Sequence, residues 1–284
     1  MKKSINAWTF PDALDFEACL VAAKEAGFDA VEFNLDRESS ASAHSFKLST
    51  PAEVIYEVAE LAKKHGMAIA SISSSLHNGI WTRTSAEDVQ YARDVLRKQL
   101  FIAKALGADG ILVVPGGMAD GILLSEARER SLANLKAALP IIEEFGIKVG
   151  LENVWNGFFL SPYDMVSFID EIGHPLVGAY FDIGNMVAFS DSVFWTDVIA
   201  SRTFKVHVKD FKRNGGRINC GGVFCQLLDG DVDFERVMAI LKRDGFDGYV
   251  TSEVFKGDLD MSDADYYKLI SDAETKIIEF YNKA

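Results

Sequence analysis

Cysteine is scarce in this chain of 284 residues, and the three cysteines show no pattern of a structural site. Cys19, Cys220 and Cys225 are odd in number and lack the CxxC spacing of zinc sites and redox pairs. We expect them to be free thiols in a reducing compartment, an interpretation we favour over catalytic use.

Long apolar runs are absent as well. No stretch approaches the roughly 18 consecutive apolar residues of a membrane span. The first residues, MKKSINAWTFPD, alternate in character and reach Pro11 and Asp12 without the apolar core of a signal peptide. We therefore expect a cytoplasmic protein that has no membrane partner.

Positive charge is in deficit, because 29 Lys and Arg residues stand against 42 Asp and Glu residues and give a formal net charge of −13. Such a charge repels a phosphate backbone at long range. A nucleic-acid partner is therefore not expected, whereas a small molecule fits this composition.

No linker or low-complexity segment divides the chain, and its main regularity is an alternation of strand-like and helix-like segments. Several helical segments end at a glycine, such as Gly66, Gly107 and Gly146, and a last helix is predicted to begin after Ser262. The strand-like runs lie at 4–9, 29–34, 67–73, 110–115, 148–153, 177–182, 204–209 and 248–254.

This count of strands predicts the fold. Eight strands that are each followed by a helix form either a closed barrel or a large open parallel sheet. An open sheet would be expected to carry a glycine-rich phosphate loop after the first strand, where this chain has WTFP at 8–11. We therefore predict a single-domain (β/α)₈ TIM barrel over residues 1–284.

Side-chain alternation predicts which residues face the barrel axis, because the side chains that face the helices should be apolar. In the fifth strand Val149 and Leu151 form the apolar set, so that Glu152 points to the axis. The same alternation directs three further polar residues inward: Asp182, His207 and Glu253. All four lie toward the C-terminal ends of their strands, where barrel enzymes carry their active sites.

These four side chains predict a metal site. Alone, an Asp after a strand is usually a turn or cap residue, and a lone His is usually a hydrogen-bonded core residue. Three carboxylates and an imidazole in one barrel mouth would, without a cation, cost several kcal/mol in desolvation and repulsion. We predict one divalent ion held by Glu152, Asp182, His207 and Glu253, with Mn²⁺ as first choice and Mg²⁺, Co²⁺ or Zn²⁺ as alternatives.

A metal in this position suggests proton chemistry beside a carbonyl. An ion chelated by the carbonyl and adjacent hydroxyl of a ketose stabilises the enediolate formed when the carbon between them loses its proton. Glu152 and Glu253 come from well-separated strands, so one can act as base on one face of the sugar and the other as acid on the opposite face.

Other polar residues have two interpretations each. The basic segment around KDFKRNGGR, together with Lys205 and Lys209, either binds a sugar phosphate or neutralises nearby carboxylates. His77, Trp8 and Trp81 either contact a sugar or pack their own loops. Glu32 is predicted to form a buried ion pair with Lys205, in preference to a catalytic role.

Five segments resemble the metal-dependent sugar epimerases and isomerases of the xylose-isomerase-like barrel superfamily, which include ketose 3-epimerases and their sugar-phosphate counterparts. They are LENVWN, YFDIGN, KVHVKD, DGDVDFERVM and GYVTSEV, and they lie within residues 149–254. The resemblance implies that Glu152 and Glu253 act as an acid/base pair on a sugar or sugar phosphate, that Arg213 touches the substrate beside Lys209 and Asn185, and that the protein is a homo-oligomer, dimer or tetramer.

Two positions depart from the free-ketose epimerases. Asn185 stands where some of them have a histidine, and Phe158 stands where they have a glutamate. Similar segments occur in metal-dependent lyases, such as inosose dehydratases and subunits that cleave C-glycosides. A lyase that shares the enolisation step is therefore the alternative hypothesis, and a non-catalytic sugar-binding protein is a third.

Overall fold

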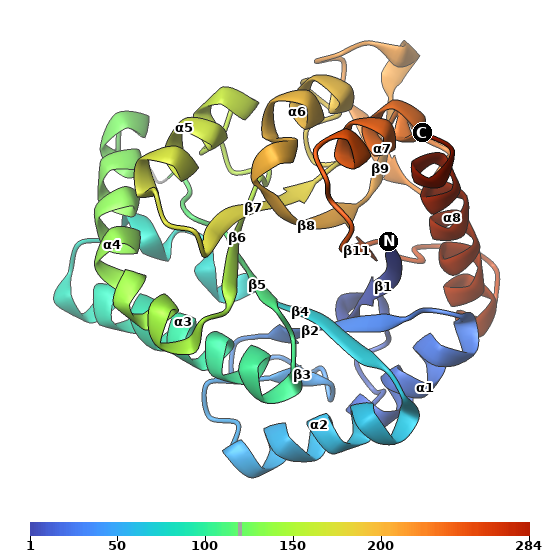
Figure 1. Cartoon of the computed structure of the whole chain (residues 1–284), viewed down its shortest axis with the longest axis horizontal. Helices are drawn as coiled ribbons and strands as arrows, with labels where there is room; N and C mark the ends of the chain where they lie inside the picture. Colours follow the sequence, from blue (N-terminus) through green and yellow to red (C-terminus); the bar gives the residue numbers. More distant parts are fainter. Residues whose placement is uncertain (119–120) are drawn as a thin grey trace.

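A closed barrel of eight parallel strands forms the centre of the molecule, with the helices around it (Figure 1). This computed structural model describes residues 1–118 and 121–284. The barrel strands are β1 (Lys2–Asn6), β2 (Ala30–Leu35), β4 (Ala68–Ser74), β5 (Gly110–Val113), β6 (Lys148–Glu152), β7 (Val177–Asp182), β8 (Thr203–Val208) and β11 (Tyr249–Ser252). The ring closes because β1 pairs with both β11 and β2. The predicted fold is confirmed.

The helices follow the strands in the order that the alternation predicts. They are α1 (Phe16–Ala26), α2 (Ala52–His65), α3 (Ala86–Leu106), α4 (Leu124–Phe145), α5 (Pro162–Ile172), α6 (Ser192–Ile199), α7 (Phe234–Arg243) and α8 (Asp263–Lys283). Gly66, Gly107 and Gly146 end their helices in the left-handed conformation, and the Ser262 side chain caps α8. Within the described ranges, none of the helices has the length and apolar character that crossing a bilayer requires.

Short elements complete the barrel. Strand β3 (Ser45–Phe46) extends the sheet beside β2, and β9 (Asp210–Arg213) pairs with β10 (Gly222–Cys225) in an antiparallel hairpin that follows β8. The 3₁₀ turns are η1 (Ala7–Thr9), η2 (Ser75–His77), η3 (Ile80–Thr82), η4 (Ala200–Arg202) and η5 (Asn214–Gly216). The first strand ends at Asn6, earlier than predicted, because the Asn6 side chain accepts from the Trp8 amide and begins η1.

The strands separate an apolar layer from a polar axis. Val149, Leu151 and Phe181 are fully buried in the core between strands and helices, as the alternation predicts. Inside the ring, the Glu32 carboxylate accepts hydrogen bonds from Asn6 and other buried polar groups. The barrel therefore holds its polar groups on the axis, toward the mouth.

The predicted Glu32–Lys205 ion pair is wrong. The Lys205 ammonium donates to the carbonyl of Ala70 at 2.7 Å and pairs with Asp109, which directly precedes β5. Glu32 pairs with His207 instead. The long Lys205 side chain reaches the N-terminal end of the barrel, where the 64% exposed Asp109 side chain keeps the pair in contact with water.

Candidate metal centre

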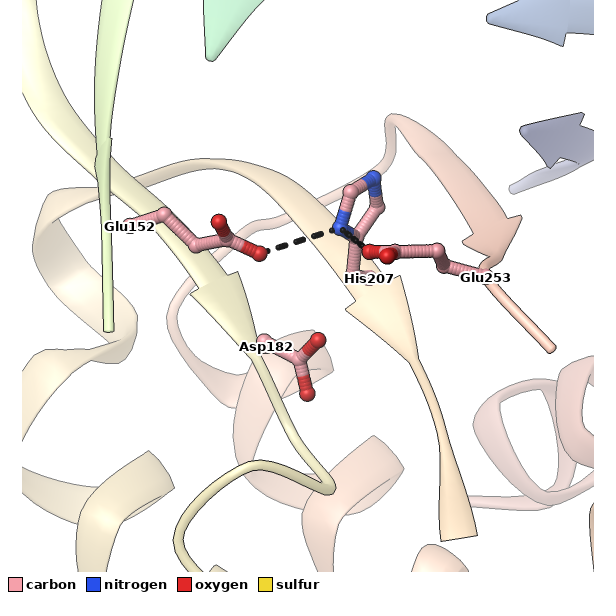
Figure 2. Close-up of side chains that lie close together, drawn as sticks. All are labelled: Glu152, Asp182, His207 and Glu253. Atoms are coloured by element: carbon pink, nitrogen blue, oxygen red, sulfur yellow. Dashed lines mark hydrogen bonds and ion pairs between the residues drawn. The ribbon is translucent and has the colours of Figure 1, made fainter. Parts of the chain in front are cut away.

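Four strand ends bring Glu152, Asp182, His207 and Glu253 together at the C-terminal mouth of the barrel (Figure 2). One ligand atom from each residue lies within 4.8 Å of all the others. His207 Nδ1 is 3.2 Å from Glu152 Oε1 and 3.1 Å from Glu253 Oε2. In Figure 2 the two glutamates approach the imidazole from opposite sides, so that the cluster has the spacing and direction expected of a single ion site.

His207 is oriented by a buried carboxylate behind it. Its Nε2 lies 2.6 Å from Glu32 Oε2, and both side chains are fully buried. Glu32 also accepts hydrogen bonds from Asn6 Nδ2, Ser71 Oγ and the Tyr180 hydroxyl, each at 2.8 Å. Nε2 therefore serves as the donor to Glu32, and Nδ1 faces the cluster, which is how a carboxylate commonly presents a histidine to a metal.

Asp182 has one anchored oxygen and one that faces the cluster. Its Oδ1 accepts from the amides of Gly184 and Asn185, both at 2.9 Å. Its Oδ2 is buried and, among the described residues, is held by no backbone amide; it faces the Lys209 ammonium at 3.0 Å. A carboxylate that is fixed by backbone amides and turns its other oxygen to the cluster fits a metal ligand better than a helix cap.

Lys209 enters the same cluster from the end of β8. Its Nζ lies 3.0 Å from Asp182 Oδ2 and 3.0 Å from Glu253 Oε2. Although burial acts to lower the pKa of Lys209, the carboxylates of Asp182, Glu253 and Glu152 raise it well above its usual range. The ammonium thus offsets part of the negative charge, and the convergence of four ligand atoms within 4.8 Å is stronger support for a metal than the charge alone.

The two glutamates differ in protonation even though they lie at similar distances from His207. Burial raises the pKa of Glu152 to about 7. Burial acts in the same direction on Glu253, but the charge of Lys209 and the hydrogen bond from His207 outweigh it and lower its pKa to about 2. In the protein without metal, Glu253 is therefore ionised while Glu152 exchanges a proton near neutral pH.

A cavity of about 520 Å³ opens above the cluster, and Glu152, Glu253 and Lys209 lie at its base. Two other predicted substrate residues, Trp8 and Asn185, line the cavity. Asn185 is held by its Nδ2, which donates to the carbonyl of Asn153 at 2.9 Å. The structure therefore brings three of the five predicted substrate residues to the cavity that two of the four predicted ligands, Glu152 and Glu253, also line.

His77 and Arg213 do not line this cavity. His77 is buried between Gln99 Oε1, at 2.6 Å from Nε2, and the Trp81 indole, which donates to Nδ1 at 3.1 Å. Burial lowers the pKa of His77 to about 4, so it is neutral. The Arg213 guanidinium donates to the carbonyls of Val187 and Ser190, both at 2.7 Å.

The side chains of His77 and Arg213 therefore stabilise loops at the mouth of the barrel. Trp81 is fully buried beside His77. Phe158, the second departure from the ketose 3-epimerases, is buried against Phe159 and Phe168. No carboxylate is supplied from that position.

Sequence reasoning missed an aromatic wall on the same cavity, formed by Trp155, Phe224 and Phe255. Trp155 lies three residues after Glu152, inside a segment that was singled out, and Phe255 lies two residues after Glu253. For Trp155 and Phe255, aromatic residues shortly after the predicted metal ligands were the signal that could have found them.

Comparison with known proteins agrees with the barrel fold. Residues 20–273 match the family described as xylose isomerase-like TIM barrel. A ketose 3-epimerase from Arthrobacter globiformis is 28% identical over 248 residues, which cover 82% of this chain and 75% of that protein. A putative L-ribulose-5-phosphate 3-epimerase from Shigella dysenteriae is 24% identical over 257 residues, covering 87% of this chain and 86% of that protein.

The fold is shared with solved structures as well. The crystal structure of the IOLI protein with a binding zinc atom has a TM-score of 0.80 and 16% identity, and the similarity covers 99% of each chain. The family match spans most of the sequence and includes all four residues of the cluster. The protein therefore belongs to the xylose isomerase-like TIM barrel family.

Proposed function

We propose that this protein is a divalent metal-dependent sugar epimerase or isomerase. It would invert the stereocentre beside a carbonyl or move the carbonyl to that neighbouring carbon. The observation that carries the proposal is the placement of Glu152 and Glu253 on opposite sides of His207 Nδ1, at 3.2 and 3.1 Å. The epimerase names of the relatives support the same class of reaction.

The metal would be held by His207 Nδ1, Asp182 Oδ2 and the carboxylates of Glu152 and Glu253, with Mn²⁺ as the first candidate. When bound, it would polarise the substrate carbonyl and stabilise the negative charge that develops on its oxygen. Glu32 would keep the His207 lone pair directed at the site, because it holds the Nε2 proton.

The two glutamates would move the proton. One carboxylate removes the proton from the carbon beside the carbonyl, and the other returns a proton to the opposite face. Their roles exchange in the reverse direction. Lys209, which lies 3.0 Å from Glu253 Oε2, would stabilise the ionised form of that glutamate between turnovers. Homo-oligomerisation as a dimer or tetramer and a cytoplasmic location remain parts of this proposal.

Hydrogen exchange tests the proposal directly. We would incubate the Mn²⁺-loaded protein with a panel of free and phosphorylated ketoses in D₂O and follow the products by mass spectrometry and NMR. One deuterium at the carbon beside the carbonyl, in an epimer of otherwise unchanged mass, is the expected result. Glu152→Gln and Glu253→Gln should each reduce exchange about a hundredfold or more. Absence of exchange across the panel, with metal binding demonstrated, would contradict the proposal.

A lyase is the second candidate, and one observation favours it. Asn185 lines the cavity where some ketose 3-epimerases carry a histidine, and Phe158 is packed in the core where they carry a glutamate. The enolisation step would be unchanged, but a leaving group would depart in place of reprotonation. The same experiment distinguishes the two, because dehydration or cleavage changes the product mass.

A further inference from the structure

The outer part of the cavity is built from aromatic rings that remain accessible. Trp155, Phe224 and Phe255 line it and are 53%, 48% and 59% exposed. The Trp155 and Phe224 rings lie 5.1 Å apart between centroids. Apolar side chains that gather in a concave site beside a polar cluster indicate a ligand surface, whereas isolated exposed aromatics need no explanation.

This wall is supported from behind. The buried Phe211 ring packs edge-on against Trp155 at 5.6 Å and against Phe224 at 5.3 Å. Phe211 and Phe224 are paired neighbours in the β9–β10 hairpin. The indole Nε1 of Trp155 donates to the carbonyl of Asn185, which fixes the ring plane. The Trp155 and Phe224 rings therefore do not have to be ordered by the ligand, and this lowers the entropic cost of stacking on them.

The hairpin itself is fixed at its base by Asp210. Its carboxylate is buried and accepts from the amides of Phe211 at 2.9 Å, Gly230 at 2.9 Å and Val232 at 3.2 Å. These contacts join the start of the hairpin to the segment before α7. The aromatic wall thus stands on a braced element at the mouth of the barrel.

The charges at the cavity disfavour a phosphate. Of the described residues that line it, Lys209 is the only cation, and its ammonium is paired with Asp182 and Glu253. The three other basic residues of the loop after β8 do not line the cavity: Lys212 pairs with Asp231 at 3.2 Å, Arg213 donates to backbone carbonyls, and Arg217 lies outside the lining. Within the described lining, a phosphate dianion would meet carboxylates without a free cation to offset the repulsion.

The size of the cavity points in the same direction. Its volume of about 520 Å³ falls in the range of sites that enclose drug-sized ligands, roughly 300–1,000 Å³. A single sugar at the metal cluster would leave the aromatic wall uncovered. We propose that the wall formed by Trp155, Phe224 and Phe255 is a subsite for an aromatic substituent, so that the substrate is an unphosphorylated sugar that bears an aryl aglycone and carries, on another ring carbon, the carbonyl that the proposed enolisation requires.

This inference rests on the proposed function only in placing the sugar at the metal cluster, and binding tests it without turnover. The probes are phenyl and methyl β-D-glucopyranoside, the same pair of β-D-galactopyranosides, and glucose 6-phosphate. Their affinities for the Mn²⁺-loaded protein would be measured by calorimetry and by the change in tryptophan fluorescence. In at least one pair we expect the phenyl glycoside to bind about tenfold more tightly than the methyl glycoside, and glucose 6-phosphate to bind more weakly than both.

Two variants test whether the phenyl preference comes from the wall, and a third variant serves as the matched control. Phe224→Ser and Phe255→Ser should each remove most of the phenyl preference and leave the affinity for the methyl glycoside within about twofold. The two residues are 48% and 59% exposed, and the second variant keeps the test decisive if the first fails to fold. Tyr163→Ser, at a 62% exposed aromatic of α5 outside the cavity, should leave the phenyl preference unchanged.

Three results would overturn the inference: equal binding of phenyl and methyl glycosides in both pairs, tighter binding of glucose 6-phosphate, or a phenyl preference that survives both variants. Sedimentation of Phe224→Ser adds a fourth, because dissociation of an oligomer would identify the wall as a subunit interface. If deuterium exchange fails while the phenyl preference holds, the proposed function fails alone. If exchange occurs without a phenyl preference, only the subsite is lost.

Discussion

The two ends of the barrel differ in how their buried charged side chains are paired. At the N-terminal end, the Lys205 ammonium pairs with Asp109 and donates to the carbonyl of Ala70. At the C-terminal mouth, Lys209 likewise lies 3.0 Å from Asp182 and Glu253, but three carboxylates and His207 Nδ1 converge there within 4.8 Å. Both ends contain axial charges from β8, so charge alone does not mark a site. The convergence of several ligand atoms on one point does.

The largest expected effect comes from removing the negative charge of Asp182. In Asp182→Asn the amide can still accept from Gly184 and Asn185, but it no longer carries the charge that a divalent ion requires. We expect Mn²⁺ affinity, measured by calorimetry, to fall more than about a hundredfold, and deuterium exchange to be lost with it.

Asp109→Asn is the matched control at the other end of the barrel, where Asp109 pairs with Lys205 of β8. It makes the same chemical change in a carboxylate that already has a cation, and it should leave Mn²⁺ affinity within about twofold. Equal losses in the two variants would show that the comparison between the barrel ends has no bearing on metal binding.

Orientation of the histidine should have the next largest effect. Glu32→Gln keeps the size of the side chain but replaces the charged acceptor of the Nε2 proton. Outer carboxylates of this kind typically contribute 10- to 100-fold to metal affinity, and we expect a loss of about that size in a calorimetric titration with Mn²⁺.

Ser71→Ala provides the control for Glu32→Gln, because it removes a hydrogen bond to Glu32 Oε1 and leaves the bond to His207 intact. Its Mn²⁺ affinity should change by only a few fold. If Ser71→Ala were as damaging as Glu32→Gln, the buried network as a whole, and not the histidine, would set the affinity.

Much of this architecture is predictable from the sequence because its determinants are local. Alternation along each strand defines the direction of Glu152, Asp182 and His207, and parallel strands bring their C-terminal ends to one mouth. The partner of Lys205 was not predictable in the same way. A long side chain can reach either end of the barrel, and the choice depends on neighbours that only the assembled ring defines.

The aromatic wall was missed for a related reason. Trp155, Phe224 and Phe255 lie in loops and a hairpin without hydrophobic periodicity, and they come together only because three strands end at the same mouth. Arg213 shows the converse, since its position in the sequence predicted a substrate contact while its guanidinium binds the carbonyls of Val187 and Ser190.

Protons should compete with the metal at the mouth. Burial raises the pKa of Glu152 to about 7. Burial acts to lower the pKa of His207, but Tyr180, the charge of Glu32 and the hydrogen bonds that His207 donates to Glu152 and Glu253 raise it. Both groups must lose a proton before they can bind an ion. Mn²⁺ affinity is therefore expected to rise with pH across 6 to 8, by about tenfold per unit for each proton released.

Calorimetry in buffers of different ionisation enthalpy counts those protons. Glu152→Gln removes one of the two groups, so its affinity should be lower overall and should rise less steeply with pH. An affinity that is independent of pH in the native chain would mean that neither group is protonated in the metal-free cluster.

The smallest effect is expected where charges are already satisfied. Lys205→Met keeps a long unbranched side chain in place but removes the hydrogen bond to Ala70 and the pair with Asp109. Because Asp109 is 64% exposed, water can replace its lost partner, and the main cost is the buried Ala70 carbonyl, about 1–3 kcal/mol of unfolding free energy. Urea unfolding measures that loss, while Mn²⁺ affinity should stay within about twofold. A variant that kept its stability and lost metal binding would instead show that Lys205 contributes to metal affinity. The charges at the two ends of the barrel would then act together on the metal site.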